Sequence, residues 1–227
     1  CEVTLETPKV AFRETIRKQS DVDSKYKKQS GGHGQYGHVK MRFAPSGDLE
    51  IPYEFDEEVV GGAVPKNYFP AVEKGLQESV VKGPLAGYPV VDVKVELYDG
   101  SYHEVDSSEM AFKVAASMAF KDGMRKANPI ILEPIFKVEV TTPEEYMGDI
   151  MGDINKKRGK VLGMEPFKGT KQLIMAEAPQ SETFKYAIDL KAMTQGKGYF
   201  EMEFERYDEV PSQLAQKIIE ERKNEEH

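Results

Sequence analysis

The ordered succession of strand and helix patterns after Asn128 constrains the fold more than any other feature of the sequence. Four stretches alternate apolar with polar residues, as half-buried strands do, and two segments between them carry helix start and stop signals. In order they are the strand Ile135–Val140, the helix Pro143–Lys157, the strands Lys160–Phe167 and Gln172–Ala176, the helix Ser181–Met193 and the strand Tyr199–Glu205. This β-α-β-β-α-β order predicts a ferredoxin-like sandwich.

The helices of this half have recognisable ends. Pro143 and the two glutamates after it suit the start of the first helix, and Gly159 is expected to end it after three basic residues. Ser181 is expected to cap the second helix, and Gly196 to end it. Pro211 predicts the start of a short amphipathic helix near the end of the chain.

The residues before Asn128 predict a separate module of strands and helices. Period-two alternation marks strands over 39–43, 49–55 and Val90–Leu97, and Asp99-Gly100 reads as a turn. Pro65 predicts a helix start, and Lys82-Gly83-Pro84 predicts its end.

A second helix is predicted from Asp106 to about Lys126. Asp106 with Glu109 three residues later forms a variant of the capping box, and Asn128-Pro129 ends the segment. A domain boundary near Asn128–Pro134 follows, so the chain of 227 residues is predicted to be an α+β protein of two domains.

Composition excludes several classes of protein. Hydrophobic residues make up 39% of the chain, enough for a core, but no apolar run approaches the length of a membrane helix. Cys1 is the sole cysteine, and the four histidines lack a ligand spacing, so neither an internal disulfide nor a metal site is expected. We expect a cytoplasmic protein without membrane contact. Because no methionine starts the chain, we also expect a fragment of a longer protein.

Charge is segregated along the chain. The net charge of −8 argues against a nucleic-acid partner, yet residues 24–42 and 156–171 each carry a net charge of +5. Residues 48–58 carry −6 and the segment from Glu201 onward carries −5. Two basic patches on an acidic body favour selective contact with a polyanion. The alternative is that each patch is an ordinary solvated face.

The segment 32–39 (GHGQYGHV) matches the glycine-loop pattern G-x-G-x-x-G-x-V. A dinucleotide-binding fold needs a helix after the glycines, but a strand pattern follows here, and the other kinase motifs are missing. A nucleotide-binding enzyme is therefore a disfavoured alternative. Glycines beside rings and lysines suit a probe for structured RNA, and an ordinary hairpin connection explains them equally well.

The segment Asp99–Asp106 is a second candidate loop, with Ser101, Tyr102 and His103 as its polar side chains. His103 has no serine or cysteine nucleophile in an arranged pair, so we expect no catalytic residue. An exposed or capping histidine is the alternative reading of His103.

Four runs of residues resemble the elongation factor G family of bacterial translational GTPases. They are QSGGHGQYGHV (29–39), LAGYPV (85–90), YDGSYHEVDSSE (98–109) and GDIMGD (148–153). Together with FRET (12–15) and YDEVP (207–211) they occur in family order over nearly the whole chain. The resemblance implies the last two of five domains.

The resemblance implies residue ranges and folds. Residues 1–7 would end the third domain, 8–127 would form the fourth, 128–208 the fifth, and 209–227 a C-terminal helix and tail. The fourth domain would resemble domain 2 of ribosomal protein S5, with a left-handed β-α-β crossover, and the fifth would be ferredoxin-like.

The resemblance also implies a function. The tip of the fourth domain would enter the decoding side of the A site, beside transfer RNA and messenger RNA, during GTP-dependent translocation. The fifth domain would lie near the sarcin-ricin loop of ribosomal RNA. GTP and magnesium would bind a GTPase domain absent from this chain, which itself would be a non-enzymatic, monomeric part without a cofactor. The implied ribosome contacts are Lys25, Lys27, Lys28, Gly31, Gly32, His33, Gly34, Gln35, Tyr36, Ser101, Tyr102, His103, Lys156, Lys157 and Arg158.

Some positions depart from the usual family pattern. His33 stands where the family commonly has arginine, which removes a permanent charge and a bidentate donor. The segments 180–185 and 191–193 also differ from common forms. A paralogue that acts in ribosome recycling is therefore an alternative to a translocase.

Overall fold

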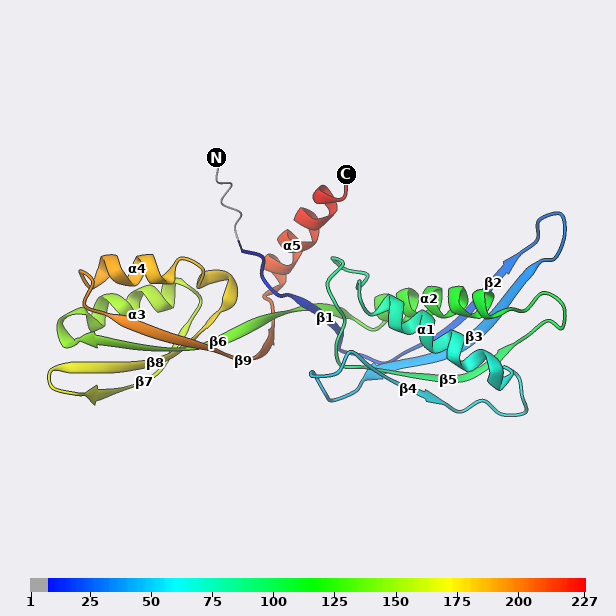
Figure 1. Ribbon diagram of the computed structural model, residues 1–227, viewed down its shortest axis with the longest axis horizontal. Coiled ribbons are helices and arrows are strands. Elements are labelled where there is room, and N and C mark those ends of the chain that lie inside the picture. Colours follow the sequence, from blue (N-terminus) through cyan, green and yellow to red (C-terminus); the bar gives the residue numbers. More distant parts are fainter. Residues whose placement is uncertain (1–7) are drawn as a thin grey trace. The chain divides into compact units, whose positions relative to one another are not determined.

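The computed structural model describes residues 8–227 (Figure 1); the predicted end of a preceding domain, 1–7, lies outside the described residues. The described residues form two compact units. The larger unit comprises Phe12–Leu132 and Glu209–His227, and the smaller unit comprises 8–11 and Glu133–Asp208. Both units contain helices and strands, so the α+β class is confirmed. No described helix is both long and apolar enough to cross a membrane.

The larger unit is built on a four-stranded sheet. The strand order is β2 (Ser20–Lys28), β3 (Gln35–Pro45), β5 (Val93–Ser101) and β4 (Tyr53–Glu57). A 3-10 turn, η1 (Lys66–Tyr68), leads into α1 (Phe69–Ser79), which packs with α2 (Glu109–Lys126) on one face of the sheet (Figure 1). Strands β4 and β5 are parallel and joined through α1. The predicted β-α-β crossover is therefore present, and its left-handed sense stays a prediction.

The core of the larger unit lies between the sheet and the two helices. Val39, Met41 and Phe43 of β3 are fully buried and alternate with more exposed residues, as their period predicts. The ring of Phe43 meets that of Phe120 edge-on, with centroids 6.1 Å apart. Gly123 of α2 faces the Phe43 ring so closely that a Cβ would overlap it. This glycine lets the helix approach the sheet.

Strand β5 differs from its prediction. The predicted strand Val90–Leu97 is present with shifted bounds, since β5 begins at Val93. The predicted turn at Asp99-Gly100 is wrong, because β5 continues through Gly100 to Ser101. A Cβ on Gly100 would overlap the carbonyl of His38 on β3, so glycine serves strand approach rather than a turn. The predicted strand at 49–55 is likewise shorter and shifted, at Tyr53–Glu57.

Two predicted helix ends in the larger unit are also wrong. Ser108, not Asp106, caps α2, and its Oγ accepts a hydrogen bond from the N–H of Ala111 at 3.1 Å. Helix α1 ends at Ser79, before Lys82-Gly83-Pro84. Gly83 instead lies against the carboxylate of Glu14, where a Cβ would overlap it.

The smaller unit has the predicted β-α-β-β-α-β order. Its sheet runs β9 (Tyr199–Glu209), β6 (Pro129–Pro143), β8 (Lys171–Pro179) and β7 (Lys160–Phe167). Two short 3-10 turns, η2 (Glu144–Tyr146) and η3 (Gln180–Glu182), precede α3 (Met147–Lys156) and α4 (Tyr186–Met193). The helices enclose a core of Val138, Val140, Ile150, Ile154, Ile174, Ala176 and Leu190. The predicted ferredoxin-like sandwich is therefore confirmed.

The division between the units falls inside a strand rather than in a linker. Strand β6 starts at Pro129, and the division lies between Leu132 and Glu133. The first four residues of β6 pair antiparallel with β1 (Arg13–Ile16) in the larger unit. The strand that was predicted to begin at Ile135 begins at Pro129, because proline is allowed at a strand start and where no ladder hydrogen bond is needed.

Three predicted helix ends of the smaller unit are shifted. Ser181 does not cap α4, which begins at Tyr186; the Ser181 hydroxyl accepts from Nη2 of Arg158 at 3.3 Å. At the end of α3, Arg158 rather than Gly159 takes the left-handed conformation, with φ 55°. Helix α4 ends at Met193, before Gly196.

The predicted helix after Pro211 is present as α5 (Ser212–Glu225), and its contacts place it in the larger unit. Nε of Arg222 donates to the carbonyl of Ala86 at 2.9 Å, and the guanidinium lies 4.9 Å from the Tyr88 ring centroid. Nζ of Lys82 pairs with Glu226 at 2.8 Å. Helix α5 is thus anchored to the loop that follows α1.

Candidate nucleic-acid interface

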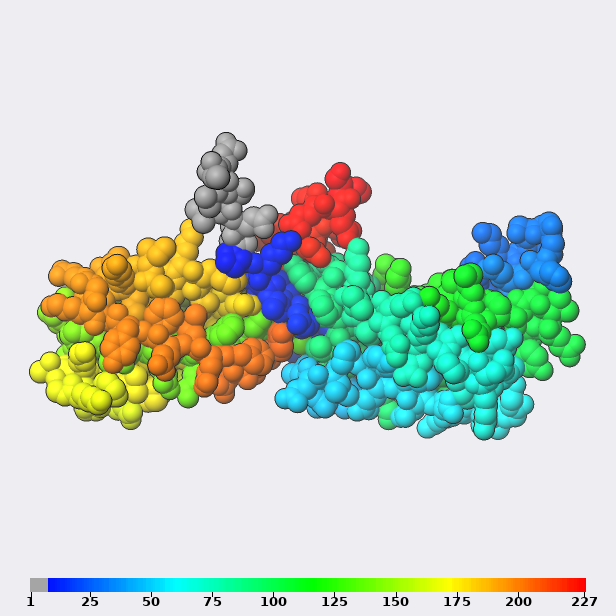
Figure 2. Space-filling model, viewed as in Figure 1, coloured from blue at the N-terminus to red at the C-terminus, as the bar shows by residue number. Residues whose placement is uncertain are grey.

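Two loops meet at one end of the larger unit and form a surface that we call the tip (29–37 and 101–107). The N–H of Tyr36 donates to the carbonyl of Asp106 at 2.9 Å, and the N–H of Gly34 donates to Oδ1 of Asp106 at 3.1 Å. Oγ of Ser107 donates to the carbonyl of Tyr36 at 2.9 Å. In Figure 2 the β2–β3 hairpin (blue) projects beside the green segment that leads into α2. The two candidate loops of the sequence therefore form one structure.

His103 is exposed at the tip, and its backbone neighbours fix its tautomer. Nδ1 accepts hydrogen bonds from the N–H groups of Val105 and Asp106, at 3.2 and 3.1 Å. A neutral ring that accepts at Nδ1 carries its proton on Nε2. The side chain is 54% exposed, so this Nε2–H group is available as a donor.

A series of hydrogen-bonded side chains on the sheet ends at the hydroxyl of Tyr36. Its hydroxyl lies 2.6 Å from Oγ of Ser101, which lies 2.6 Å from Nδ1 of His38. Nε2 of the buried His38 lies 2.5 Å from Oδ1 of Asp23. The Asp-His-Ser order resembles a hydrolytic triad, but it ends on the Tyr36 hydroxyl, so it holds a ring in place. The sequence did not reveal this series, since its members are far apart in the chain.

The lysines of the hairpin divide between its two faces. Lys25 opposes His38 and Lys27 opposes Tyr36, so both lie on the sheet face away from the helices, whereas Lys28 alternates to the other face. Nζ of Lys25 lies 5.8 Å from the Tyr36 ring centroid, and that ring lies 6.3 Å from the His103 ring. The predicted tip residues thus bring together two cations, a phenol and an imidazole.

The remaining predicted tip residues surround this group. A Cβ added to Gly31 or Gly32 would meet no atom closer than an ordinary van der Waals contact. A partner therefore has room to approach the backbone there. His33 is exposed, as are Gly31 and Gly32, and Gln35 is half-buried. The side chain of Tyr102 is large and 47% exposed.

The second predicted basic patch differs in character, because two of its three named residues pair with carboxylates. Nζ of Lys157 lies 2.9 Å from both Asp153 and Asp189; burial lowers the pKa of Lys157, but these ion pairs outweigh it and raise the pKa. Arg158 forms a bidentate pair with the buried Glu133, at 2.9 Å for both bonds. Their charges are compensated within the smaller unit, and a role in RNA binding stays a prediction.

Lys156 is exposed, and two further lysines of the second patch lie beside aromatic rings. Nζ of Lys168 lies 5.7 Å from the Phe167 ring centroid, and Nζ of Lys171 lies 5.6 Å from that of Tyr199. Tyr199 is 50% exposed. The basic surface of this unit therefore includes the β7–β8 turn. These two lysines were counted in the charge of 156–171 but were not named as predicted contacts.

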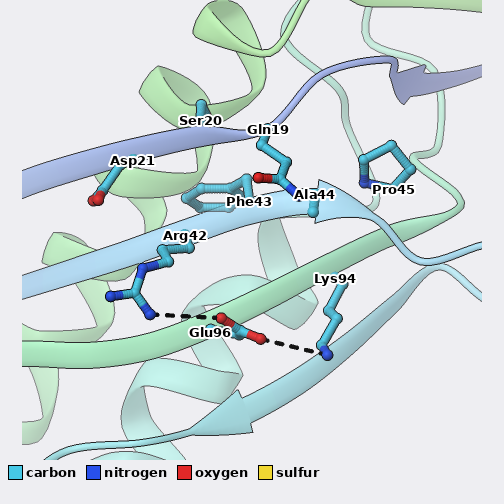
Figure 3. Close-up of a pocket in the computed structure, with 9 residues that line it drawn as sticks. All are labelled: Gln19, Ser20, Asp21, Arg42, Phe43, Ala44, Pro45, Lys94 and Glu96. Carbon is cyan, nitrogen blue, oxygen red and sulfur yellow. Dashed lines mark ion pairs between the residues drawn. The ribbon is translucent and has the colours of Figure 1, made fainter.

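One hollow of the described surface lies on the open face of the larger sheet (Figure 3). It has a volume of about 580 Å³, and Arg42, Glu96 and Lys94 line it as alternating ion pairs. The Arg42 guanidinium also stacks 3.9 Å from the Tyr98 ring centroid. Glu96 pairs with both cations, and Asp21, which also lines the hollow, accepts a hydrogen bond from the Tyr98 hydroxyl. No group of residues suited to hold a metal ion occurs in the described part of the chain.

Comparison with known protein families assigns both units. Residues 8–128 match the model for elongation factor G, domain IV, and residues 130–218 match the model for the elongation factor G C-terminus. The chain belongs to the elongation factor G family. The C-terminal elongation factor G match includes the first part of α5, although α5 packs in the larger unit.

A solved structure of a protein from Thermus thermophilus is similar to this member of the elongation factor G family. The sequences are 46% identical, the match covers 96% of this chain, and the TM-score is 0.84. The chain spans 32% of the length of that protein. Both elongation factor G matches and this similarity assign the chain to part of a translation factor.

Proposed function

We propose that this chain is the ribosome-binding C-terminal part of an elongation factor G that promotes GTP-dependent translocation of transfer RNA and messenger RNA. The tip enters the decoding side of the A site, and the smaller unit contacts ribosomal RNA near the sarcin-ricin loop. GTP and magnesium bind a GTPase domain outside this chain, which itself carries no catalytic group. The part acts as a monomer in the cytoplasm.

The geometry of the tip is the observation that carries this proposal. Its two loops are tied together by Asp106 and Ser107, so they can enter a narrow site as one body. Lys25 and Lys27 supply positive charge for phosphates, and His103 presents an Nε2–H donor. The half-buried Tyr36 ring offers a surface to a base or a ribose. An acidic body repels RNA elsewhere and orients the encounter.

The salt dependence of ribosome binding tests the tip. We expect Lys25→Glu together with Lys27→Glu to weaken binding of the chain to small ribosomal subunits and to lower the slope of log K against log salt by about 2. Binding is measured by sedimentation from about 50 to 200 mM KCl. A matched control is Lys156→Glu with Lys160→Glu, which changes charge equally in the smaller unit.

An equal effect of both double variants would contradict the tip assignment, because only the net charge would then matter. Binding that ignores salt would favour a protein-interaction module in place of RNA contact.

A paralogue active in recycling is the second candidate, favoured by His33 at the exposed tip. It predicts ribosome binding through the same tip without movement of messenger RNA. An assay of subunit splitting separates the two functions.

A further inference from the structure

His38 of β3 directly follows the tip segment 29–37, and it is a buried titratable group that the proposed function does not use directly. Its side chain is only 11% exposed, yet both ring nitrogens make short hydrogen bonds. One bond reaches the surface carboxylate of Asp23, and the other leads through Ser101 to the Tyr36 hydroxyl. The series therefore connects an ionisable group in the sheet with a phenol at the tip.

The carboxylate end fixes the direction of every bond in this series. An ionised carboxylate can only accept, so Nε2 of His38 must donate to Asp23. In the neutral ring Nδ1 is then an acceptor, so Ser101 donates to it. Oγ of Ser101 in turn accepts from the Tyr36 hydroxyl. With His38 neutral, the Tyr36 hydroxyl donates its hydrogen bond to Ser101, so toward a partner it can only accept.

Protonation of His38 reverses the outer half of the series. With both ring nitrogens protonated, Nδ1 donates to Ser101, and the Ser101 hydroxyl turns to donate to the Tyr36 oxygen. The Tyr36 proton is then free to point outward. No heavy atom has to move, because each bond keeps its two partners and exchanges donor for acceptor.

We propose that His38 is a specificity-determining residue that sets whether Tyr36 acts as a hydrogen-bond acceptor or donor toward RNA. The inference rests on the proposed RNA-binding role of the tip. With His38 neutral, Tyr36 accepts from a ribose hydroxyl. With His38 protonated, it donates to a phosphate oxygen, the more abundant acceptor on RNA.

The charged groups near His38 include both signs. Asp23 on β2 contacts Nε2, and Lys25 opposes His38 in the β2–β3 ladder. Nζ of Lys40 on β3 lies 3.9 Å from Asp23 and 3.7 Å from Asp99 of β5. Two cations and two carboxylates therefore surround the series from all three strands.

The tautomer of His38 is the first test, and it does not depend on RNA. The chain is labelled with 15N-histidine, and long-range 15N–1H spectra are recorded from about pH 5 to 8, the range in which histidine titrates. We expect His38, identified by its loss in His38→Gln, to carry its proton on Nε2 when neutral. A proton on Nδ1 would overturn the proposal.

Two carboxylate variants sharpen this test. In Asp23→Asn the amide can donate to Nε2, so we expect a population with the proton on Nδ1. Asp99→Asn removes the same charge beside Lys40 but has no bond to His38, and the spectrum should stay as in the parent. The same spectrum for both variants would overturn the assigned direction.

The effect on RNA recognition is the second test. Binding to small ribosomal subunits that carry messenger RNA is measured at about pH 8 and 5.5, on either side of the usual histidine pKa. Between pH 8 and pH 5.5 we expect the binding of the parent to strengthen, and by about tenfold more than the binding of Tyr36→Phe. This variant keeps all four histidines but lacks the tyrosine hydroxyl. Equal pH dependence in the two proteins would overturn the role of Tyr36. If neither protein binds, the proposed function fails, and the spectra still decide the direction of the series.

Discussion

At the scale of single residues, Glu14 joins two distant segments of the larger unit. Its side chain is fully buried, and its carboxylate accepts hydrogen bonds from the N–H groups of Leu85 and Tyr88 at 2.8 Å and of Ala86 at 3.1 Å. Burial raises the pKa of Glu14, and these backbone donors oppose the rise. The carboxylate therefore organises the loop against which α5 packs.

We expect Glu14→Gln to lower the free energy of unfolding of the larger unit by roughly 1–3 kcal/mol. The glutamine amide turns an N–H₂ group toward backbone N–H donors, so at least one buried donor loses its acceptor. Urea unfolding measures the change, with Glu104→Gln in an exposed loop as the control. Equal stability of the two variants would contradict this account.

Sequence patterns predicted the core residues well and the roles of several polar residues and glycines poorly. Val39, Met41 and Phe43 follow from their alternation alone, because burial on one face of a strand has period two. Gly83 was expected to end a helix, but it makes room for Glu14. That role depends on a residue almost seventy positions away, so no local pattern contains it.

At the scale of elements, the sheet of the smaller unit has an ion pair that links β8 and β9. Arg206 forms a bidentate pair with Glu177, at 2.7 and 3.0 Å. Arg206 lowers the pKa of Glu177, although partial burial opposes this. The order of helices and strands does not predict this ion pair, because the pairing register of the strands decides which side chains meet.

We expect this pair to make the stability of the smaller unit depend on pH. A carboxyl group whose pKa is lower in the folded state contributes stability above its unfolded value of about 4.5, and loses it as pH falls through the folded pKa. Because Arg206 is 42% exposed, the contribution is about 0.5–1 kcal/mol.

The parent and Glu177→Gln should therefore differ by this amount at pH 7 and converge in acid, as measured by urea unfolding. Glu165→Gln on β7 serves as the control. A difference that persists unchanged well below pH 4 would mean that Glu177 acts through packing rather than charge.

At the scale of the whole molecule, α5 follows the ferredoxin-like unit in sequence but packs in the larger unit. Ile218 and Val210 are buried there, and Arg222 bonds to the Ala86 carbonyl. The tail prediction gave the helix start at Pro211 correctly, yet amphipathicity shows only that one face is covered, not by which unit.

We expect removal of residues 211–227 to destabilise the larger unit by about 2–4 kcal/mol, the effect of exposing about two apolar side chains. The smaller unit should keep its stability. Hydrogen exchange of β3 and β8 amides reports on the two units separately. Loss of protection in β8 with β3 unchanged would contradict the assignment of α5.

The proposed function of the whole molecule depends most directly on one exposed side chain, that of His103. An elongation factor G that carries this chain as its C-terminal part is tested with GTP on pre-translocation ribosomes by toeprinting, beside its His103→Ala form and a control, Lys121→Ala, at an exposed position of α2. The account predicts a one-codon shift that His103→Ala slows by at least about tenfold while GTP hydrolysis continues, since the variant loses the exposed donor of the tip. A shift at the parent rate in His103→Ala would contradict a tip that acts at the decoding site.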